Sequence, residues 1–120
     1  MKGDLGERTK RLAIEVIRLL DSLPRDRTTD ILARQMIRAA SAVGANYRSA
    51  CRARSRADFI SRITIVEEEA DEVMYWAELL FDLRVISEAQ YSPIAREANE
   101  LTAIFVSSAK TARRNAKPIS

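Results

Sequence analysis

The chain of 120 residues is 47% hydrophobic and 31% charged, a balance that is typical of folded globular proteins and excludes a disordered chain. This length favours one domain, residues 1–120, around a single hydrophobic core. The net charge of +3 comes from 20 Lys and Arg against 17 Asp and Glu. The sequence has no His, the usual general base and metal ligand, and one cysteine, which excludes an intrachain disulfide.

Long helices are the regular structure that this composition favours. Three Gly and three Pro are too few for an all-β fold, which needs a turn about every 8 to 12 residues. Glu15 and Arg18 interrupt the apolar stretch near the N-terminus, so we expect neither a signal peptide nor a membrane span. The sequence therefore predicts an all-α protein of the cytoplasm that has no membrane partner.

The first helix is expected over residues 5–22. Asp4 followed by Glu7 resembles a capping box, in which the later acid reaches back to the backbone of the cap residue. Pro24 disfavours helical geometry in the residue before it, so the helix should end close to that point.

The second helix is expected over residues 29–51, with Thr28 or Thr29 as its N-cap. Alanines form much of its apolar face, which predicts the close approach of a neighbouring helix. Gly44 and Asn46 weaken the helix locally, and Asn46 is either a buried specificity residue or the site of a bend.

The last two helices are expected over residues 56–83 and 88–114. Each follows a capping-box pair, Ser55 with Asp58 and Ser87 with Gln90. The third helix has a heptad seam of apolar residues at alternating spacings of four and three: Phe59, Ile63, Val66, Ala70, Val73, Ala77 and Leu80. Four helices with short connections predict an antiparallel up-down-up-down four-helix bundle.

Charge is strongly segregated along the chain. Residues 25–62 carry nine Arg and three acids, whereas residues 63–90 carry eight acids and one Arg. The candidate nucleic-acid-binding residues are the arginines around the second connection: Arg48, Arg52, Arg54, Arg56 and Arg62. Arginine forms bidentate pairs with phosphate and with carboxylate equally well. These residues therefore either bind phosphates or neutralise the acids of the third helix.

The acidic cluster of the third helix consists of Glu67, Glu68, Glu69, Asp71 and Glu72. The heptad register places these acids beside or outside the seam, and no His is available, so we expect no metal site. Like charges four residues apart destabilise an isolated helix. The cluster is thus either a solvated face or part of a contact between subunits, for which the candidate residues are Glu67, Glu68, Asp71, Glu72, Tyr75 and Trp76.

No catalytic constellation is present in the sequence. It has no Gly-rich phosphate loop, and Cys51 has no imidazole to activate it. We expect Cys51 to be a small buried residue at a helix end. The sequence therefore predicts a protein that is not an enzyme and has no catalytic residue, metal or cofactor.

Three motifs of the sequence resemble a known family, the bacterial four-helix-bundle proteins related to those encoded within intervening sequences of large-subunit ribosomal RNA genes. The motifs are Gln35-x-x-Arg38-Ala39-Ala40-x-x-Val43-x-x-Asn46, then Arg54-Ser55-x-x-Asp58-Phe59, then Ile65 to Glu72 with Trp76-x-x-Leu79-Leu80. Where many relatives read Asn-Ile-Ala-Glu-Gly, this chain has Asn46-Tyr47-Arg48-Ser49-Ala50. Any role of that Glu therefore does not carry over.

The resemblance implies an antiparallel four-helix bundle and assembly into ring-shaped pentamers. The fold and assembly are also similar to the accessory bundle proteins of diversity-generating retroelements, basic pentamers that bind nucleic acid and a reverse transcriptase. We expect a non-enzymatic homo-oligomer, a pentamer, that presents arginines to RNA, DNA or a nucleoprotein. The alternative is a structural or adaptor bundle whose charges serve only self-assembly and protein partners.

Overall fold

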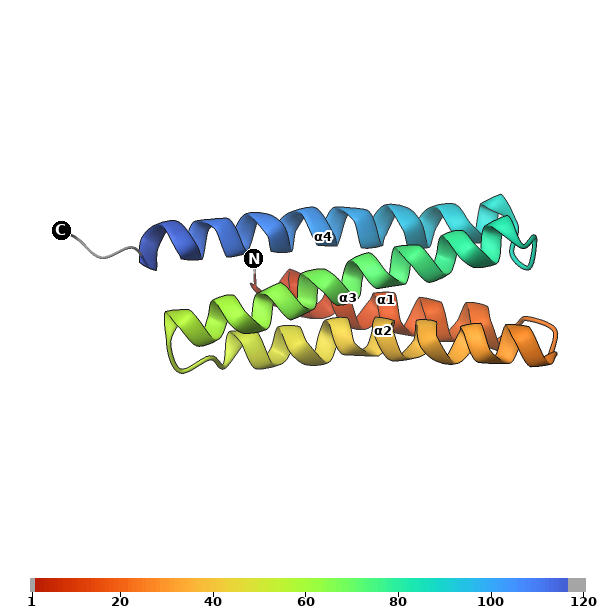
Figure 1. The fold of residues 1–120 in the computed structure, drawn as a ribbon, viewed down its shortest axis with the longest axis horizontal. Coiled ribbons are helices and arrows are strands. Elements are labelled where there is room, and N and C mark those ends of the chain that lie inside the picture. The colour runs from red at the N-terminus through yellow and green to blue at the C-terminus, as the bar shows by residue number, and fades with distance from the viewer. Residues whose placement is uncertain (1, 117–120) are drawn as a thin grey trace.

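Short connections force consecutive helices to run antiparallel, as Figure 1 shows. The structure is a computed structural model that describes residues 2–116, with side chains for residues 4–115. The helices are α1 (Lys2–Asp21), α2 (Arg27–Cys51), α3 (Arg56–Asp82) and α4 (Glu88–Ala116). The prediction of an all-α, up-down-up-down four-helix bundle is confirmed. None of the helices within the described residues has an apolar stretch long enough to cross a bilayer.

Two of the predicted helix starts were wrong. The first helix already begins at Lys2, so Asp4 lies inside its first turn, where a negative charge favours the positive end of the helix dipole. The N-cap of α2 is Asp26, not Thr28 or Thr29. Its carboxylate accepts hydrogen bonds from the backbone N–H of Thr29 at 2.9 Å and from the Thr29 hydroxyl at 3.1 Å. Asp26 caps better than a threonine because one carboxylate satisfies both donors.

The predicted caps of α3 and α4 are confirmed. The Ser55 hydroxyl accepts from the backbone N–H of Asp58 at 3.0 Å. The Asp58 carboxylate reaches the N–H of Arg54, one residue earlier than in a standard capping box, at 3.3 Å. Ser87 and Gln90 form the complete reciprocal pair, at 3.2 Å and 2.8 Å. These side chains satisfy backbone donors that the first helical turn leaves without partners.

The connection from α3 to α4 reverses direction through Arg84, whose φ of 61° is in the left-handed region. The N–H of Arg84 donates to the carbonyl of Phe81, and the N–H of Val85 donates to the carbonyl of Leu80, both at 2.9 Å. This is the Schellman geometry that ends many helices, usually with glycine at the left-handed position. Because an arginine has a Cβ atom that glycine lacks, the left-handed conformation of Arg84 costs about 1–2 kcal/mol.

The core follows the predicted seam of α3. Six of its seven residues, from Ile63 to Leu80, are at most 1% exposed, whereas Phe59 is only half-buried. Opposite them, α2 contributes the fully buried alanines Ala39 and Ala40, which let the two helices approach closely. Phe105 of α4 is the largest fully buried side chain, and its ring centre lies 5.7 Å from that of Tyr47.

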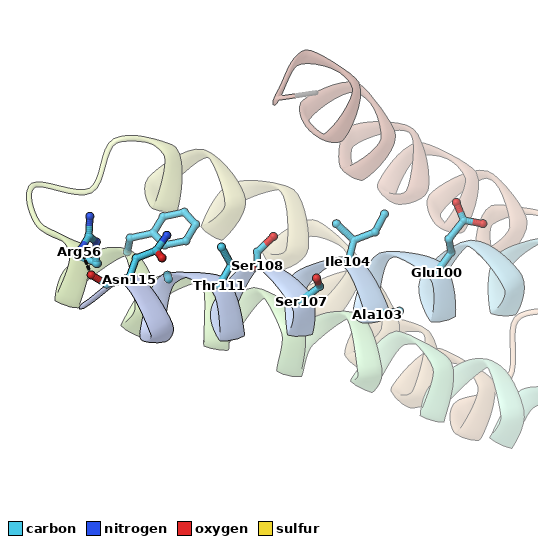
Figure 2. A pocket seen from close by; sticks show the side chains of 10 residues that line it. Arg56, Glu100, Ala103, Ile104, Ser107, Ser108, Thr111 and Asn115 are labelled. Atoms are coloured by element: carbon cyan, nitrogen blue, oxygen red, sulfur yellow. Dashed lines mark hydrogen bonds between the residues drawn. The ribbon is translucent and has the colours of Figure 1, made fainter. Parts of the chain in front are cut away.

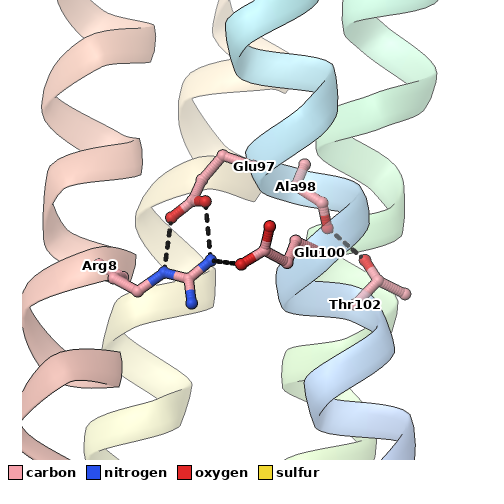
Figure 3. Close-up of polar contacts among 5 residues, drawn as sticks. All are labelled: Arg8, Glu97, Ala98, Glu100 and Thr102. Atoms are coloured by element: carbon pink, nitrogen blue, oxygen red, sulfur yellow. Dashed lines mark hydrogen bonds and ion pairs between the residues drawn. The ribbon is translucent and has the colours of Figure 1, made fainter.

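The contact between α1 and α4 is the sparsest of the four helix–helix contacts, and Arg8 forms ion pairs across it. The Arg8 guanidinium binds both carboxylate oxygens of Glu97, at 2.9 Å and 2.8 Å, and one oxygen of Glu100 at 2.7 Å (Figure 3). Because α1 has 20 residues and α4 has 29, α4 continues past the N-terminal end of α1. The last turns of α4 therefore have no α1 beside them.

Candidate nucleic-acid interface

The connection from α2 to α3 and the C-terminal turns of α4 meet at one end of the bundle (Figure 1). Arg56 donates a hydrogen bond to the carbonyl of Asn115, and Arg113 donates one to the Thr64 hydroxyl at 3.3 Å. Basic residues of α4 thus join the predicted arginines. We call this set the basic pole: Arg48, Arg52, Arg54, Arg56, Arg62, Lys110, Arg113 and Arg114.

The contribution of α4 to the basic pole was not predicted from the sequence. Lys110, Arg113 and Arg114 are about 50 residues away from the other members in sequence, and all three are exposed. The up-down topology brings the end of the fourth helix back to the second connection, so a combined reading of topology and charge would have found them. Asp58 is the one acid in residues 48–62 and 110–115.

Four predicted arginines form no ion pair with any residue in the described part of the chain: Arg48, Arg52, Arg54 and Arg56. Arg62 pairs with Asp58, four residues earlier, at 3.0 Å. The N–H of Arg54 and the Arg62 guanidinium both hold the pKa of Asp58 below its ordinary value. Arg52, Arg54, Asp58 and Arg62, together with Ser49, line a pocket of about 310 Å³.

The acidic cluster finds a different partner. Arg38 of α2 pairs with Glu69 at 3.2 Å and also with Glu72. Glu72 further accepts a hydrogen bond from the Trp76 indole at 3.0 Å, and this bond, followed by the Arg38 contact, lowers the pKa of Glu72. Within the described chain, therefore, the acidic cluster of α3 forms no ion pair with the basic pole.

The residues predicted for a subunit contact are only partly brought together. Glu72, Trp76 and Tyr75 form one cluster, in which the Tyr75 and Trp76 rings meet edge to face at 5.1 Å. The other three, Glu67, Glu68 and Asp71, form no ion pair with any residue between 4 and 115. Tyr75 is 55% exposed, and one oxygen of Glu69 is buried without a hydrogen-bond partner. No group of acidic or cysteine side chains among the described residues is placed to hold a metal ion.

A second feature of this end is a groove of about 910 Å³, which we call the α4 groove. It is lined by Arg56, Phe59, Glu100, Ala103, Ile104, Ser107, Ser108, Thr111, Ala112 and Asn115. Figure 2 shows Ile104, Ser108 and Thr111 in a row along α4, on the side from which α1 has diverged. The hydroxyls of Ser107, Ser108 and Thr111 within an otherwise apolar helix pattern are the signal that the sequence analysis missed.

The prediction that Cys51 is buried was wrong, because the thiol is exposed at the last residue of α2. One turn earlier, Tyr47 is 7% exposed, and burial followed by the neighbouring Cys51 raises the pKa of the Tyr47 hydroxyl. Asn46 donates its side-chain amide to the carbonyl of Ala42 at 2.9 Å, within a continuous helix. This bond gives Asn46 a local structural role.

A family model and a solved structure each match this chain over most of its length. The model of the 23S rRNA-intervening sequence protein family matches residues 3–107. The crystal structure of a protein of unknown function from the S23 ribosomal protein family of Bacteroides thetaiotaomicron VPI-5482 has a TM-score of 0.84 and 32% identity, over 92% of this chain and 99% of that one. A search of curated proteins finds no match. The resemblance stated from the sequence motifs is thus confirmed, and the chain belongs to the 23S rRNA-intervening sequence protein family.

Proposed function

We propose that this protein is not an enzyme and that it binds nucleic-acid phosphates through the basic pole. The observation that carries the proposal is that Arg48, Arg52 and Arg54 stay exposed and unpaired within the described chain, although the acids of α3 are available in the same molecule. A cluster of like charges without counterions raises the free energy of the folded state. A bound polyanion relieves this repulsion between the arginines. Its binding is favoured further because the polyanion releases its condensed counterions.

A purely structural interpretation explains only part of the pattern. Arg48 and Arg52 lie at the C-terminal end of α2, and Arg113 and Arg114 lie at that of α4, where positive charge favours the helix dipole. This effect falls off within one turn and does not account for Arg54 and Arg56 at the start of α3, where the helix dipole disfavours a positive charge. Arg62, further along α3, has Asp58 as a partner within the helix. Phosphate binding accounts for all of these residues together.

The salt dependence of binding tests this proposal. The family name refers to 23S rRNA, so a short labelled structured RNA is the first ligand to use. Contact with three to five phosphates predicts a slope of about −2 to −4 in log K against log salt between about 50 mM and 200 mM. Fluorescence anisotropy at several salt concentrations measures this slope. Absence of binding at about 50 mM salt would favour the adaptor alternative.

We further propose that copies of the chain assemble through the outer face of α3, as a pentamer. The exposed Tyr75 ring and the unpartnered buried oxygen of Glu69 support this second proposal. Aromatic side chains are enriched in the buried centres of subunit contacts. A head-to-tail contact between one acidic and one basic surface closes into a ring when its rotation allows.

Sedimentation of the pure protein tests the assembly. The wild type should form one discrete species larger than the 13.5 kDa monomer. A variant with Glu68→Arg and Tyr75→Ala should weaken the association by about 2 kcal/mol or more, because it removes an aromatic contact and reverses a charge. The control Glu15→Arg makes the same charge change at an exposed position of α1, a helix that forms no contact with α3 in the described chain, and should assemble normally. A monomeric wild type would disprove the assembly.

A further inference from the structure

We infer that the α4 groove receives unpaired nucleic-acid bases while the basic pole holds the phosphates beside them, so that the protein selects single-stranded or looped segments over continuous duplex. This inference rests on the proposed phosphate binding and adds to it a base site and a choice of ligand. It is carried by the position of the groove, by its charge and by the side chains that line it.

The groove and the basic pole share Arg56. Its side chain lines the groove, and its guanidinium is held by the carbonyl of Asn115 at the far end of α4. From Asn115 the groove extends along α4 to Glu100, which at a rise of 1.5 Å per residue corresponds to about 22 Å. A strand whose phosphates contact the pole therefore has several bases within reach of the groove.

The charges at the two ends of the α4 groove favour an anionic ligand that enters from the basic pole. The end of the groove near Asn115 adjoins Arg113 and Arg114, whereas the single acid of the lining, Glu100, lies at the opposite end and is already bound to Arg8. An anionic ligand is favoured at the first end and repelled at the second. A nucleic-acid strand satisfies this asymmetry when it enters from the pole.

The lining also suits bases better than it suits a helix of a partner protein. An amphipathic helix requires a continuous apolar groove. Here Ser107, Ser108, Thr111 and Asn115 place hydroxyl and amide groups along the wall, and these groups can both donate and accept hydrogen bonds, as base edges require.

Phe59 supplies the aromatic face that base recognition needs. Its half-buried ring lines the groove next to Arg56, a position that the sequence analysis assigned to the helix seam. Unpaired bases stack on such rings and offer their edges to side chains, whereas paired bases remain stacked within the duplex. The groove can therefore engage a loop or a single strand, and a continuous duplex can reach only the pole.

A groove-filling variant tests the inference. Ser107→Trp places a bulky side chain in the groove at an exposed position of α4, and the control Ser61→Trp makes the same change at an exposed position of α3 outside the groove. The ligands are a single-stranded RNA and a fully paired RNA of equal strand length at the same salt concentration. The wild type should prefer the single strand, and Ser107→Trp should weaken that binding about ten-fold or more, which is the scale of one lost stacking contact.

The same variant should leave duplex binding within about two-fold, and Ser61→Trp should change neither ligand. Thr111→Val, which removes a hydroxyl but keeps the side-chain shape, gives a milder test that does not depend on tolerance of the tryptophan. Unchanged single-strand binding by both groove variants would overturn the base site and leave a partner helix as the occupant. An equal loss of affinity for the single-stranded and the fully paired RNA would also overturn the base site. Failure of the wild type to bind either RNA would instead disprove the phosphate-binding proposal itself.

Discussion

Phe105→Ala should lower the free energy of unfolding by about 3–5 kcal/mol, because it removes the largest fully buried side chain and leaves a cavity that close-packed neighbours fill only in part. The Phe105 ring extends from α4 to Tyr47 on α2, so its loss also removes an aromatic contact between the two helices. A domain of this size has about 5–15 kcal/mol of total stability. Phe105→Ala should therefore remove a large part of the total stability.

Chemical denaturation of wild type and variant at one protein concentration measures this loss. Phe105→Leu should cost about 1–1.5 kcal/mol, since it keeps most of the apolar volume. Phe81→Ala is the matched control, because Phe81 is only half-buried while its ring stacks on Tyr91 at 4.7 Å. A loss at Phe105 no greater than that at Phe81 would contradict the assignment of Phe105 to the centre of the core.

Combined replacement of Arg48, Arg52 and Arg54 by Ala should weaken RNA binding at low salt by about 10²-fold to 10³-fold and reduce the magnitude of the salt slope by about 2 to 3. None of the three forms an ion pair in the described chain, so their removal leaves no carboxylate without its partner. Stability should therefore change little. Salt titration of the anisotropy signal gives both quantities.

The matched control has the same change in net charge at the other end of the bundle. Arg25, Arg27 and Arg34 are all exposed and lie in or just after the connection from α1 to α2. Their replacement by Ala should leave both the affinity and the salt slope nearly unchanged. If the two triple variants lose affinity equally, binding depends on net charge alone, and the basic pole is not a site.

The helices could be predicted from the sequence because local patterns determine them. Apolar spacing of three and four gave the seam from Ile63 to Leu80, and the capping pairs at Ser55 and Ser87 fixed two helix starts. The start of α2 was misassigned because Asp26 and the two threonines after it all suit an N-cap. Only the backbone geometry distinguishes them.

The candidate site could be predicted only in part, because it depends on how the helices align. The register of α2 against α3 decides which arginine pairs with the acidic cluster. This register selects Arg38, whose partners Glu69 and Glu72 are 31 and 34 residues away in sequence. The α4 groove depends on the unequal lengths of α1 and α4 and on the divergence of α1. Neither property is encoded in a short motif.

The position of the basic pole changes what a ligand in solution meets. The molecule is 58 Å long and only 23 Å by 21 Å across, whereas the Debye length at physiological ionic strength is about 8 Å. The two ends of the rod are thus electrically independent, so charges at the far end of the bundle do not reach the pole. A polyanion diffusing nearby responds to this concentrated positive potential, not to the modest net charge of +3. The rod is therefore steered into end-on encounters, which raises the rate of productive collisions.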